Sequence, residues 1–233
     1  MIPVTPISER VARVQEQIER AKARRGPGPQ VTVVAASKRQ PVEAILSALD
    51  AGLQDFGENY AQEFRRKGDA ISRAELRWHF IGALQTNKAG LVAGRALIHT
   101  VDRVRLIDAL EAKTAQLTTA VIQPVLIEVN FGEAQKAGVE SAGVPLLLAA
   151  LDAAPHLRCD GLMTIPPTGT PEHTRAHFVR LRQLRDKVQA CTDAKLHHLS
   201  MGMSADYDVA IEEGASIIRV GTAIFGPRPA ASG

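Results

Sequence analysis

The chain has 233 residues, of which 45% are hydrophobic and 4% aromatic, and it carries a formal net charge of +3 at pH 7. This length and apolar content allow one sizeable core, and the few aromatic residues with a mild positive charge argue against a nucleic-acid binder. The basic runs at 22–25 and 65–67 fit solvated helix faces better than a binding patch.

The first predicted element is a helix over 8–25. Its apolar residues, among them Val11 and Ile18, recur at helical spacing, and Ser8 is placed to cap the first turn. The Gly-Pro run at 26–29 ends this helix.

A short run of largely β-branched residues, VTVVAASK at 31–38, predicts the first strand. Pro41 stops the strand and suits the first turn of a helix that closes at Gly52. Because side chains alternate along a strand, Ala36 and Lys38 share one face, which leaves space beside the lysine.

The same alternation repeats to the end of the chain. Further strands are predicted at 55–57, 77–81, 96–101, 124–130, 158–165, 196–200 and 216–220, and helices at 59–71, from 85, over 102–117 with Asp102 as N-cap, at 141–151, at 171–190 and from 204. About eight βα units at this length predict a closed (β/α)8 TIM barrel with an additional N-terminal helix. We expect a single domain over 1–226 and a disordered tail over 227–233.

Targeting and cysteine patterns predict a cytoplasmic protein. The first residues lack the basic start and apolar core of a signal peptide, and no apolar stretch reaches the roughly 18 residues that a membrane span needs. Cys159 and Cys191 fit neither a metal motif nor a CxxC pair. We therefore expect no membrane and no nucleic-acid partner.

Lys38 is the first candidate for a functional group. In such a barrel the active site lies at the carboxyl ends of the strands, and an amine inside an apolar layer must be paired or used. Lys38 could hold a phosphate, pair with a carboxylate or form a Schiff base. The alternative is a lysine that extends from the strand end into solvent.

The loops after the last two strands have the composition of a phosphate site, which this fold often places there. Ser200, Gly202 and Ser204 precede one helix, and Gly221-Thr222 precede another turn. Glycine lets the backbone approach an anion, and exposed N–H groups and hydroxyls bind it. Two ordinary helix caps are the alternative, but the pattern at both expected places favours phosphate.

Arg219 lies in the last strand, where either face is buried, so its guanidinium needs a partner. That partner is either a structural salt bridge or a ligand ring. With Lys38 and the phosphate loops, Arg219 suggests pyridoxal 5′-phosphate (PLP), held as an imine on the lysine with its ring nitrogen at the arginine. An arginine there disfavours protonation of the ring, which suits holding the cofactor better than broad carbanion chemistry.

Seven motifs run in order along nearly the whole chain. They are VAASK ending at Lys38, FGENYAQE (56–63), WHFIGALQTNK (78–88), HTVD (99–102), EVNFGEAQKAGV (128–139), GLMTIPP (161–167) and LSMGMSADYDVAIEEGASIIRVGTAIFG (199–226). In these motifs the chain resembles the PLP homeostasis protein family, the YggS/PROSC group of PLP-binding barrels. That family looks like the barrel domain of alanine racemase standing alone.

The resemblance implies a protein that holds PLP as an internal aldimine on Lys38. It buffers or delivers the cofactor, influences vitamin B6 and amino-acid balance, and has no robust enzymatic activity. We expect a monomer whose partners are PLP and apo PLP-dependent enzymes. The candidate cofactor-binding residues are Lys38, Asn59, His79, Ser200, Met201, Arg219, Gly221 and Thr222. Arg39-Gln40 and Asp160 depart from the family pattern, which leaves partner contacts open.

Two enzymatic alternatives stay open. A PLP-dependent amino-acid racemase with weak activity needs acid and base groups on both faces of the substrate carbon, and only Tyr60 and Tyr207 are available as tyrosines beside Lys38. The chain ends soon after its last strand, so we expect no β domain of the kind that completes a racemase site. A phosphosugar enzyme without a cofactor could use Lys38 with Glu58 or His79 as its acid.

The histidines do not predict a metal site. His79 and His99 are single residues on separate strands, and His197 and His198 are adjacent, which is no ligand spacing. Packing, or hydrogen bonding next to a ligand, is the favoured role.

Overall fold

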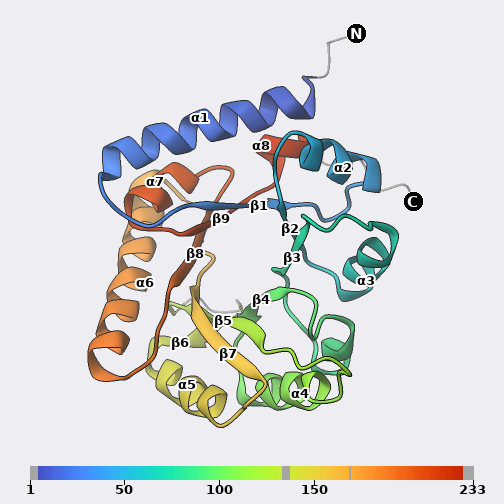
Figure 1. Ribbon diagram of the computed structural model, residues 1–233. Coiled ribbons are helices and arrows are strands. Elements are labelled where there is room, and N and C mark those ends of the chain that lie inside the picture. The colour runs from blue at the N-terminus through green and yellow to red at the C-terminus, as the bar shows by residue number, and fades with distance from the viewer. Residues whose placement is uncertain (1–4, 133–136, 168, 228–233) are drawn as a thin grey trace.

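Strand pairing closes the sheet into a ring. The computed structural model describes residues 5–132, 137–167 and 169–227. Parallel strands follow the order β4-β3-β2-β1-β9-β8-β7-β5, and β4 pairs with β5 to complete the barrel (Figure 1). The strands are β1 (Thr32–Ala36), β2 (Asp55–Glu58), β3 (Arg77–Phe80), β4 (Leu97–Val101), β5 (Gln123–Asn130), β7 (Leu157–Met163), β8 (His198–Met203) and β9 (Ile217–Val220), while the short β6 (Val139–Glu140) pairs with β5 alone. The predicted TIM barrel is confirmed.

Helices surround the ring, and α1 lies across α2, α7 and α8 as the predicted additional helix (Figure 1). They are α1 (Ile7–Arg25), α2 (Val42–Asp50), α3 (Ala61–Ala70), the 3-10 helix η1 (Thr86–Leu91), α4 (Val104–Thr114), the 3-10 turn η2 (Ser141–Gly143), α5 (Val144–Asp152), α6 (Pro171–Cys191), α7 (Tyr207–Glu212) and α8 (Thr222–Phe225). In the part of the chain that the structure describes, no helix combines the length and apolar character of a membrane span. Of the predicted tail, only Pro227 falls within the described residues.

Two predicted helix caps are wrong. Helix α1 begins one residue before Ser8, and its N-cap is Pro6, whose φ of −57° already suits a helix start. Helix α4 has Arg103 as its N-cap, because the Asp102 carboxylate pairs with the Arg103 guanidinium instead of capping the backbone.

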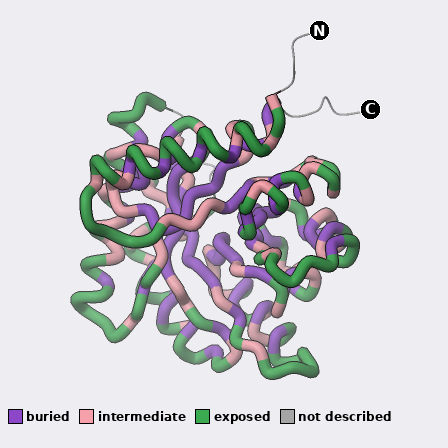
Figure 2. The backbone as a smooth tube through the Cα atoms, turned by 45° about the horizontal axis from the view of Figure 1, so that its top comes forward, coloured by how far each residue is buried: buried purple, intermediate pink, exposed green. Residues whose placement is uncertain are grey.

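The apolar core has two parts. The larger one lies between the strands and the surrounding helices, and the buried strands at the centre of the molecule contrast with the exposed outer faces of the helices (Figure 2). The smaller part fills the inside of the barrel and consists of Val34, Leu126, Met163 and Ile217. Side chains that follow these residues on the same strand face, toward the carboxyl ends, therefore point to the barrel mouth.

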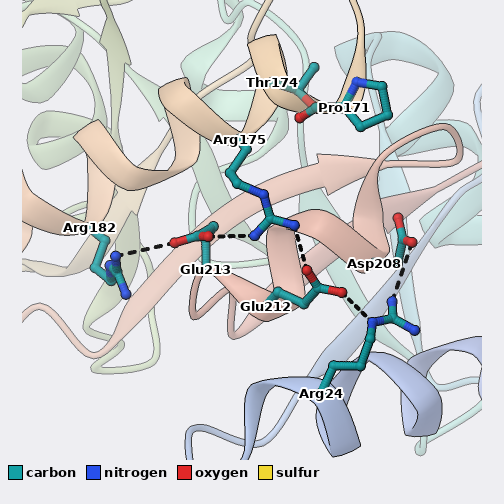
Figure 3. Close-up of polar contacts among 8 residues, drawn as sticks. All are labelled: Arg24, Pro171, Thr174, Arg175, Arg182, Asp208, Glu212 and Glu213. Atoms are coloured by element: carbon teal, nitrogen blue, oxygen red, sulfur yellow. Dashed lines mark hydrogen bonds and ion pairs between the residues drawn. The ribbon is translucent and has the colours of Figure 1, made fainter.

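Ion pairs fasten α1 and α6 to α7 (Figure 3). The Glu212 carboxylate accepts hydrogen bonds from Arg24 of α1 and from Arg175 of α6, the latter at 2.5 Å, and Arg175 also donates to Glu213 at 2.6 Å. Burial opposes ionisation of Glu212, but the hydrogen bonds from Arg175 and Arg24 lower its pKa. Helix α7 follows the loop after β8 in the chain. These ion pairs therefore hold in place the helix to which that loop leads.

Candidate cofactor site at the barrel mouth

A pocket of about 240 Å³ opens where β1, β8 and β9 end. Lys38, Arg219, Gly221 and Thr222 all line it, so the structure brings together four of the residues that the sequence assigned to one site. Strand β1 ends at Ala36 and not at Lys38, which is partly buried and lies in the following turn. The lysine is therefore positioned by whatever holds this turn.

A buried ionic cluster holds the residue before Lys38. Lys67 of α3 is fully buried, and its Nζ donates to the Ser37 carbonyl oxygen at 2.8 Å and to Glu58 at 2.7 Å, while Glu63 lies 2.8 Å away. The Ser37 hydroxyl donates to the same Glu58 oxygen at 2.7 Å. Burial raises the pKa of Glu58, and the Lys67 ammonium opposes this. The ammonium thus joins two carboxylates to the backbone of the turn.

The same cluster holds the residue after Lys38. Arg39 has a φ of 61°, in the left-handed region that residues other than glycine rarely adopt. Its backbone N–H donates to Glu63 Oε1 at 2.8 Å, which stabilises this conformation. Lys38 is therefore fixed from both sides by α3.

The expectation of a solvated helix face at 65–67 is wrong for Lys67. Helix α3 turns Ala61, Phe64 and Lys67 toward the core, and the three residues follow one another at helical spacing. This spacing was visible in the sequence and could have marked Lys67 as a buried cation. The acidic partner Glu63 precedes it by one turn.

The loops after β8 and β9 meet at the pocket. Ser204 Oγ accepts the N–H of Gly221 at 3.2 Å and the N–H of Ala223 at 3.4 Å, so a hydroxyl oxygen lies where these groups could bind an oxygen of an anion. Gly202 has a φ of 91°, and a Cβ there would lie 2.5 Å from the Ala210 Cβ. Only glycine fits this turn, which directs the chain toward Ser204.

Helix α7 begins at Tyr207, whereas the sequence predicted a helix that starts near Ser204. The Asp206 carboxylate accepts the N–H of Met203 at 2.7 Å and so stabilises a turn over the intervening residues. Ser204 is consequently a loop residue and not a helix cap.

Arg219 is 4% exposed and crosses the inner surface of the barrel. Its Nη1 donates to Ser200 Oγ at 2.6 Å and its Nη2 donates to the Thr164 carbonyl oxygen at 2.9 Å. Burial lowers the pKa of Arg219 to about 10, although Glu128 and Asp206 favour its charged form. The guanidinium therefore stays charged at neutral pH.

Ser200 connects Arg219 to a chain of buried hydrogen bonds. Ser200 Oγ lies 2.9 Å from His99 Nδ1, His99 Nε2 lies 2.9 Å from His79 Nδ1, and His79 Nε2 lies 2.9 Å from Asp55 Oδ1. We refer to these contacts, from Asp55 to Arg219, as the interior chain. It leads from the beginning of β2 to the barrel mouth.

The end of the interior chain at Asp55 is ionised. Arg77 donates two hydrogen bonds to the Asp55 carboxylate, at 2.9 and 2.7 Å. Although burial raises it, the pKa of Asp55 falls to about 2 because Arg77 and His79 donate hydrogen bonds to the carboxylate. At the centre, burial holds the pKa of His99 well below its usual value, and the charge of Arg219 lowers it further.

When Asp55 is ionised and both imidazoles are neutral, the hydrogen bonds of the interior chain allow only one position for each proton. His79 donates from Nε2 to Asp55, so its Nδ1 accepts from His99 Nε2. His99 Nδ1 then accepts the hydroxyl proton of Ser200, and Ser200 Oγ accepts from Arg219. Ser200 is fully buried, does not line the 240 Å³ pocket, and in this arrangement has no proton left for a phosphate.

Three further predicted residues also lie outside this pocket. His79 belongs to the interior chain, and Met201 packs in the apolar layer outside the barrel. Asn59 lines a second pocket of about 280 Å³ at the mouth, together with Glu128 and Thr164. Sequence reasoning missed Glu128 and Asp55. Glu128 follows Leu126 of the inner core by two residues and so shares its inward face, whereas Asp55 is recognised only from its contact with His79.

The mouth, and not the larger cavity on the side of the molecule, carries the reactive groups. That cavity, of about 830 Å³, lies between α5 and α6 and has a mainly apolar wall that includes Leu148, Leu184 and Val188. None of the predicted site residues lines it. Within the described ranges, no group of His, Cys, Asp and Glu side chains is arranged to hold a metal ion.

Comparison with known proteins places this architecture in a family. The family model described as alanine racemase, N-terminal domain, matches residues 10–229. The pyridoxal phosphate homeostasis protein of Aquifex aeolicus is 45% identical over 94% of this chain and 97% of its own length. The protein of the same name from Pseudomonas aeruginosa is 39% identical over 97% of both chains.

Solved structures agree with these relatives. PipY of Synechococcus elongatus, solved with PLP bound, has a TM-score of 0.84 and 34% identity, and the match covers 94% of this chain and all of PipY (100%). Alanine racemase of Corynebacterium glutamicum is similar in fold, with a TM-score of 0.68 at 15% identity over 93% of this chain and 61% of its own. The chain therefore belongs to the pyridoxal phosphate homeostasis protein family, whose barrel is that of the alanine racemase N-terminal domain.

Proposed function

We propose that this protein binds PLP in the pocket between Lys38 and Arg219 and serves PLP homeostasis. Relatives at 39 and 45% identity are named for this function, and PipY, at 34% identity, was solved with PLP bound. The observation that carries the proposal is an amine and a guanidinium on one pocket wall, beside the loop after β9, whose Gly221 and Ala223 N–H groups point to the Ser204 hydroxyl of the loop after β8.

The residues of the pocket fit the chemistry of PLP. When bound, PLP supplies an aldehyde carbon and an electron-withdrawing ring. Lys38 would attach the cofactor, Arg219 would donate to its ring nitrogen, and Gly221 and Thr222 would bind its phosphate. Ser204 would give up the N–H of Gly221 to a phosphate oxygen, since its hydroxyl already lies at that position.

The other predicted residues would act on the cofactor from outside this pocket. Ser200 and His79 would orient Arg219 through the interior chain, and Asn59 would border the cofactor from the second pocket. Met201 would support the β8 loop from the apolar layer.

Holding the cofactor fits this site better than racemisation. A charged arginine at the ring nitrogen disfavours ring protonation and so weakens the ring as an electron sink. A racemase also needs a second acid–base group, but Tyr60 is 48% exposed and Tyr207 donates to Gln17 of α1, and neither tyrosine lines the two mouth pockets.

Visible absorbance tests PLP binding directly. The purified protein, incubated with PLP, should show a band in the visible that Lys38→Ala abolishes. Lys195→Ala is the matched control, because Lys195 is exposed and lies away from the mouth, and it should keep the band. A wild-type protein that stays colourless after incubation with PLP would overturn the proposal.

Proton exchange tests the non-enzymatic role. PLP-loaded protein incubated with either enantiomer of alanine in D2O should give no exchange at the α-carbon above that of free PLP. Rapid exchange with inversion would replace the homeostasis function with that of a racemase.

We also propose that the protein is a cytoplasmic monomer that passes PLP to apo PLP-dependent enzymes. Mixing loaded protein with such an apo enzyme should restore its activity faster than the same concentration of free PLP. Equal rates would contradict delivery, and elution as a dimer in size-exclusion chromatography would contradict the monomer.

A further inference from the structure

The second mouth pocket adjoins the proposed PLP site. It measures about 280 Å³ and lies where β2, β3, β4, β5 and β7 end. Thr164 lines it, and the Thr164 carbonyl oxygen accepts the 2.9 Å hydrogen bond from Arg219, which lines the first pocket. The two pockets therefore share this hydrogen bond as their border.

Glu128 is a buried carboxyl group on the wall of the second pocket. It is 5% exposed, and no described residue gives it a hydrogen bond or an ion pair. Burial, with the nearby charge of Asp102, raises the pKa of Glu128 to about 7, and Arg219 partly opposes this. A buried carboxylate without a donor is costly, so a cationic donor in the pocket would stabilise it.

Asn59 adds a second acceptor. Its Oδ1 is buried without a hydrogen-bond partner among the described residues. A Cβ at Gly82 would lie 2.2 Å from the Asn59 carbonyl oxygen, so the two backbones are packed together and Asn59 is held in place. Among the described residues, neither the Glu128 carboxylate nor Asn59 Oδ1 has a hydrogen-bond partner, and both residues line one pocket.

The hydroxyl donors of this wall are already engaged. Thr100 donates to the Gly82 carbonyl oxygen at 2.7 Å, and Thr164 donates to the Val129 carbonyl oxygen at 2.9 Å. The Glu128 carboxylate is therefore the charged group that this wall offers to a ligand that brings its own donors. Ile81 and Ile165 supply apolar surface for the rest of such a ligand.

We propose that this pocket binds a small primary amine in its ammonium form, with Glu128 and Asn59 Oδ1 accepting its hydrogen bonds, and that Glu128 takes up its proton. An ammonium group carries three donors and no acceptor, which matches the acceptor-only carboxylate of Glu128. The N–H bond breaks with its electron pair left on nitrogen, and a new O–H bond forms on Glu128. The products are a neutral amine and a carboxylic acid, and a neutral amine is the form that attacks an electrophilic carbon.

This inference rests on the proposed PLP site, which gives the amine a purpose: an amine released at the border of the two pockets is placed to compete with Lys38 for the cofactor. The inference therefore implies that small amines are the class of ligand that releases PLP from the protein. The groups that act on Glu128 during this step are Asp102 and Arg219.

The test uses the full chain stripped of PLP, so that binding is observed without any reaction. The protein is titrated with ethylammonium chloride, and the thermal midpoint and the NMR signals of the Asn59 side-chain amide are followed. Tetramethylammonium chloride is the matched cation without N–H donors. We expect a saturable response to ethylammonium, none to tetramethylammonium, and at least tenfold weaker binding in Glu128→Gln.

Two variants keep the test decisive. Glu43→Gln, at an exposed position on α2, should bind ethylammonium as the wild type does. Asn59→Ala should weaken binding severalfold, and it replaces Glu128→Gln if that variant does not fold. Equal responses to both cations, or undiminished binding in Glu128→Gln or, in its place, in Asn59→Ala, would overturn the inference.

Absorbance with PLP separates this inference from the proposed function. A visible PLP band without the ethylammonium response would contradict the amine pocket alone. The ethylammonium response without a PLP band would contradict the proposed function alone.

Discussion

His79 Nδ1 lies 2.9 Å from His99 Nε2 inside the barrel, and both rings are almost fully shielded from solvent. This contact joins the Asp55–Arg77 pair to Ser200 and Arg219 at the mouth. Because a carboxylate accepts at one end and a guanidinium donates at the other, the hydrogen bonds between them all point in one direction.

The direction of the interior chain predicts the histidine tautomers. At neutral pH both His79 and His99 should carry their proton on Nε2, which is measurable by long-range ¹H–¹⁵N correlation on ¹⁵N-histidine-labelled protein. His156→Gln, at a partly exposed position outside the barrel, helps to assign the signals. A proton on Nδ1 of His99 would mean that the interior chain runs the other way and that Ser200 is free to donate elsewhere.

Asp55 should make the stability of the folded protein depend on pH in the acidic range. Its pKa is lowered from 3.8 to about 2, so the unfolded chain binds more protons than the folded one between these values. Stability from Asp55 is complete above pH 4 and is lost as the pH falls toward 2, by about 2 kcal/mol. Urea unfolding across this range should show the loss in the wild type.

Asp55→Asn is the comparison for that measurement. It should be less stable than the wild type at pH 6, and the difference should shrink as the pH approaches 2. A constant difference would show that the amide loses packing or geometry and that ionisation of Asp55 is not the cause.

Lys67→Met should destabilise the protein by about 3–5 kcal/mol, because it leaves the Glu58 carboxylate buried without its cation. PLP affinity should fall as well, since the turn that carries Lys38 loses its tie to α3. Urea unfolding and PLP titration measure the two effects. Lys113→Met, on an exposed face of α4, should change neither.

A second substitution separates charge from packing at the same place. Glu58→Gln combined with Lys67→Met removes the unpaired charge and should recover part of the stability lost in the single variant. If the double variant is as unstable as the sum of the single variants, the buried ion pair is not the cause.

Glu212→Gln should weaken the attachment of α1 and α6 to α7 by about 0.5–1 kcal/mol, the range of partly exposed ion pairs. The difference from the wild type should shrink in 1 M salt, where charges are screened. A difference that is unaffected by salt would indicate lost packing.

Much of the fold and half of the candidate site could be predicted because both depend on local pattern. The alternation of apolar runs and helical stretches indicates the barrel, and the barrel assigns function to strand ends. Lys38, Arg219, Gly221 and Thr222 were found in this way, and they line one pocket.

The rest depends on partners that are distant in the chain. The Ser200 hydroxyl is a group that often binds phosphate, but its proton is directed to His99, which lies on the opposite side of the barrel. Lys67 belongs to a basic run, and only its place on the buried stripe of α3 distinguishes it from its neighbours. Local sequence does not show which side chains meet across a barrel.

The interior chain also bears on how this protein can change over evolution. Asp55, His79, His99 and Ser200 each satisfy the next, so replacing one leaves a buried donor or acceptor of its neighbour unpaired. Substitutions at these positions should therefore occur together among relatives, as a set that keeps each hydrogen bond or removes them all. The barrel interior would then vary as a unit while the loops of the mouth vary one residue at a time.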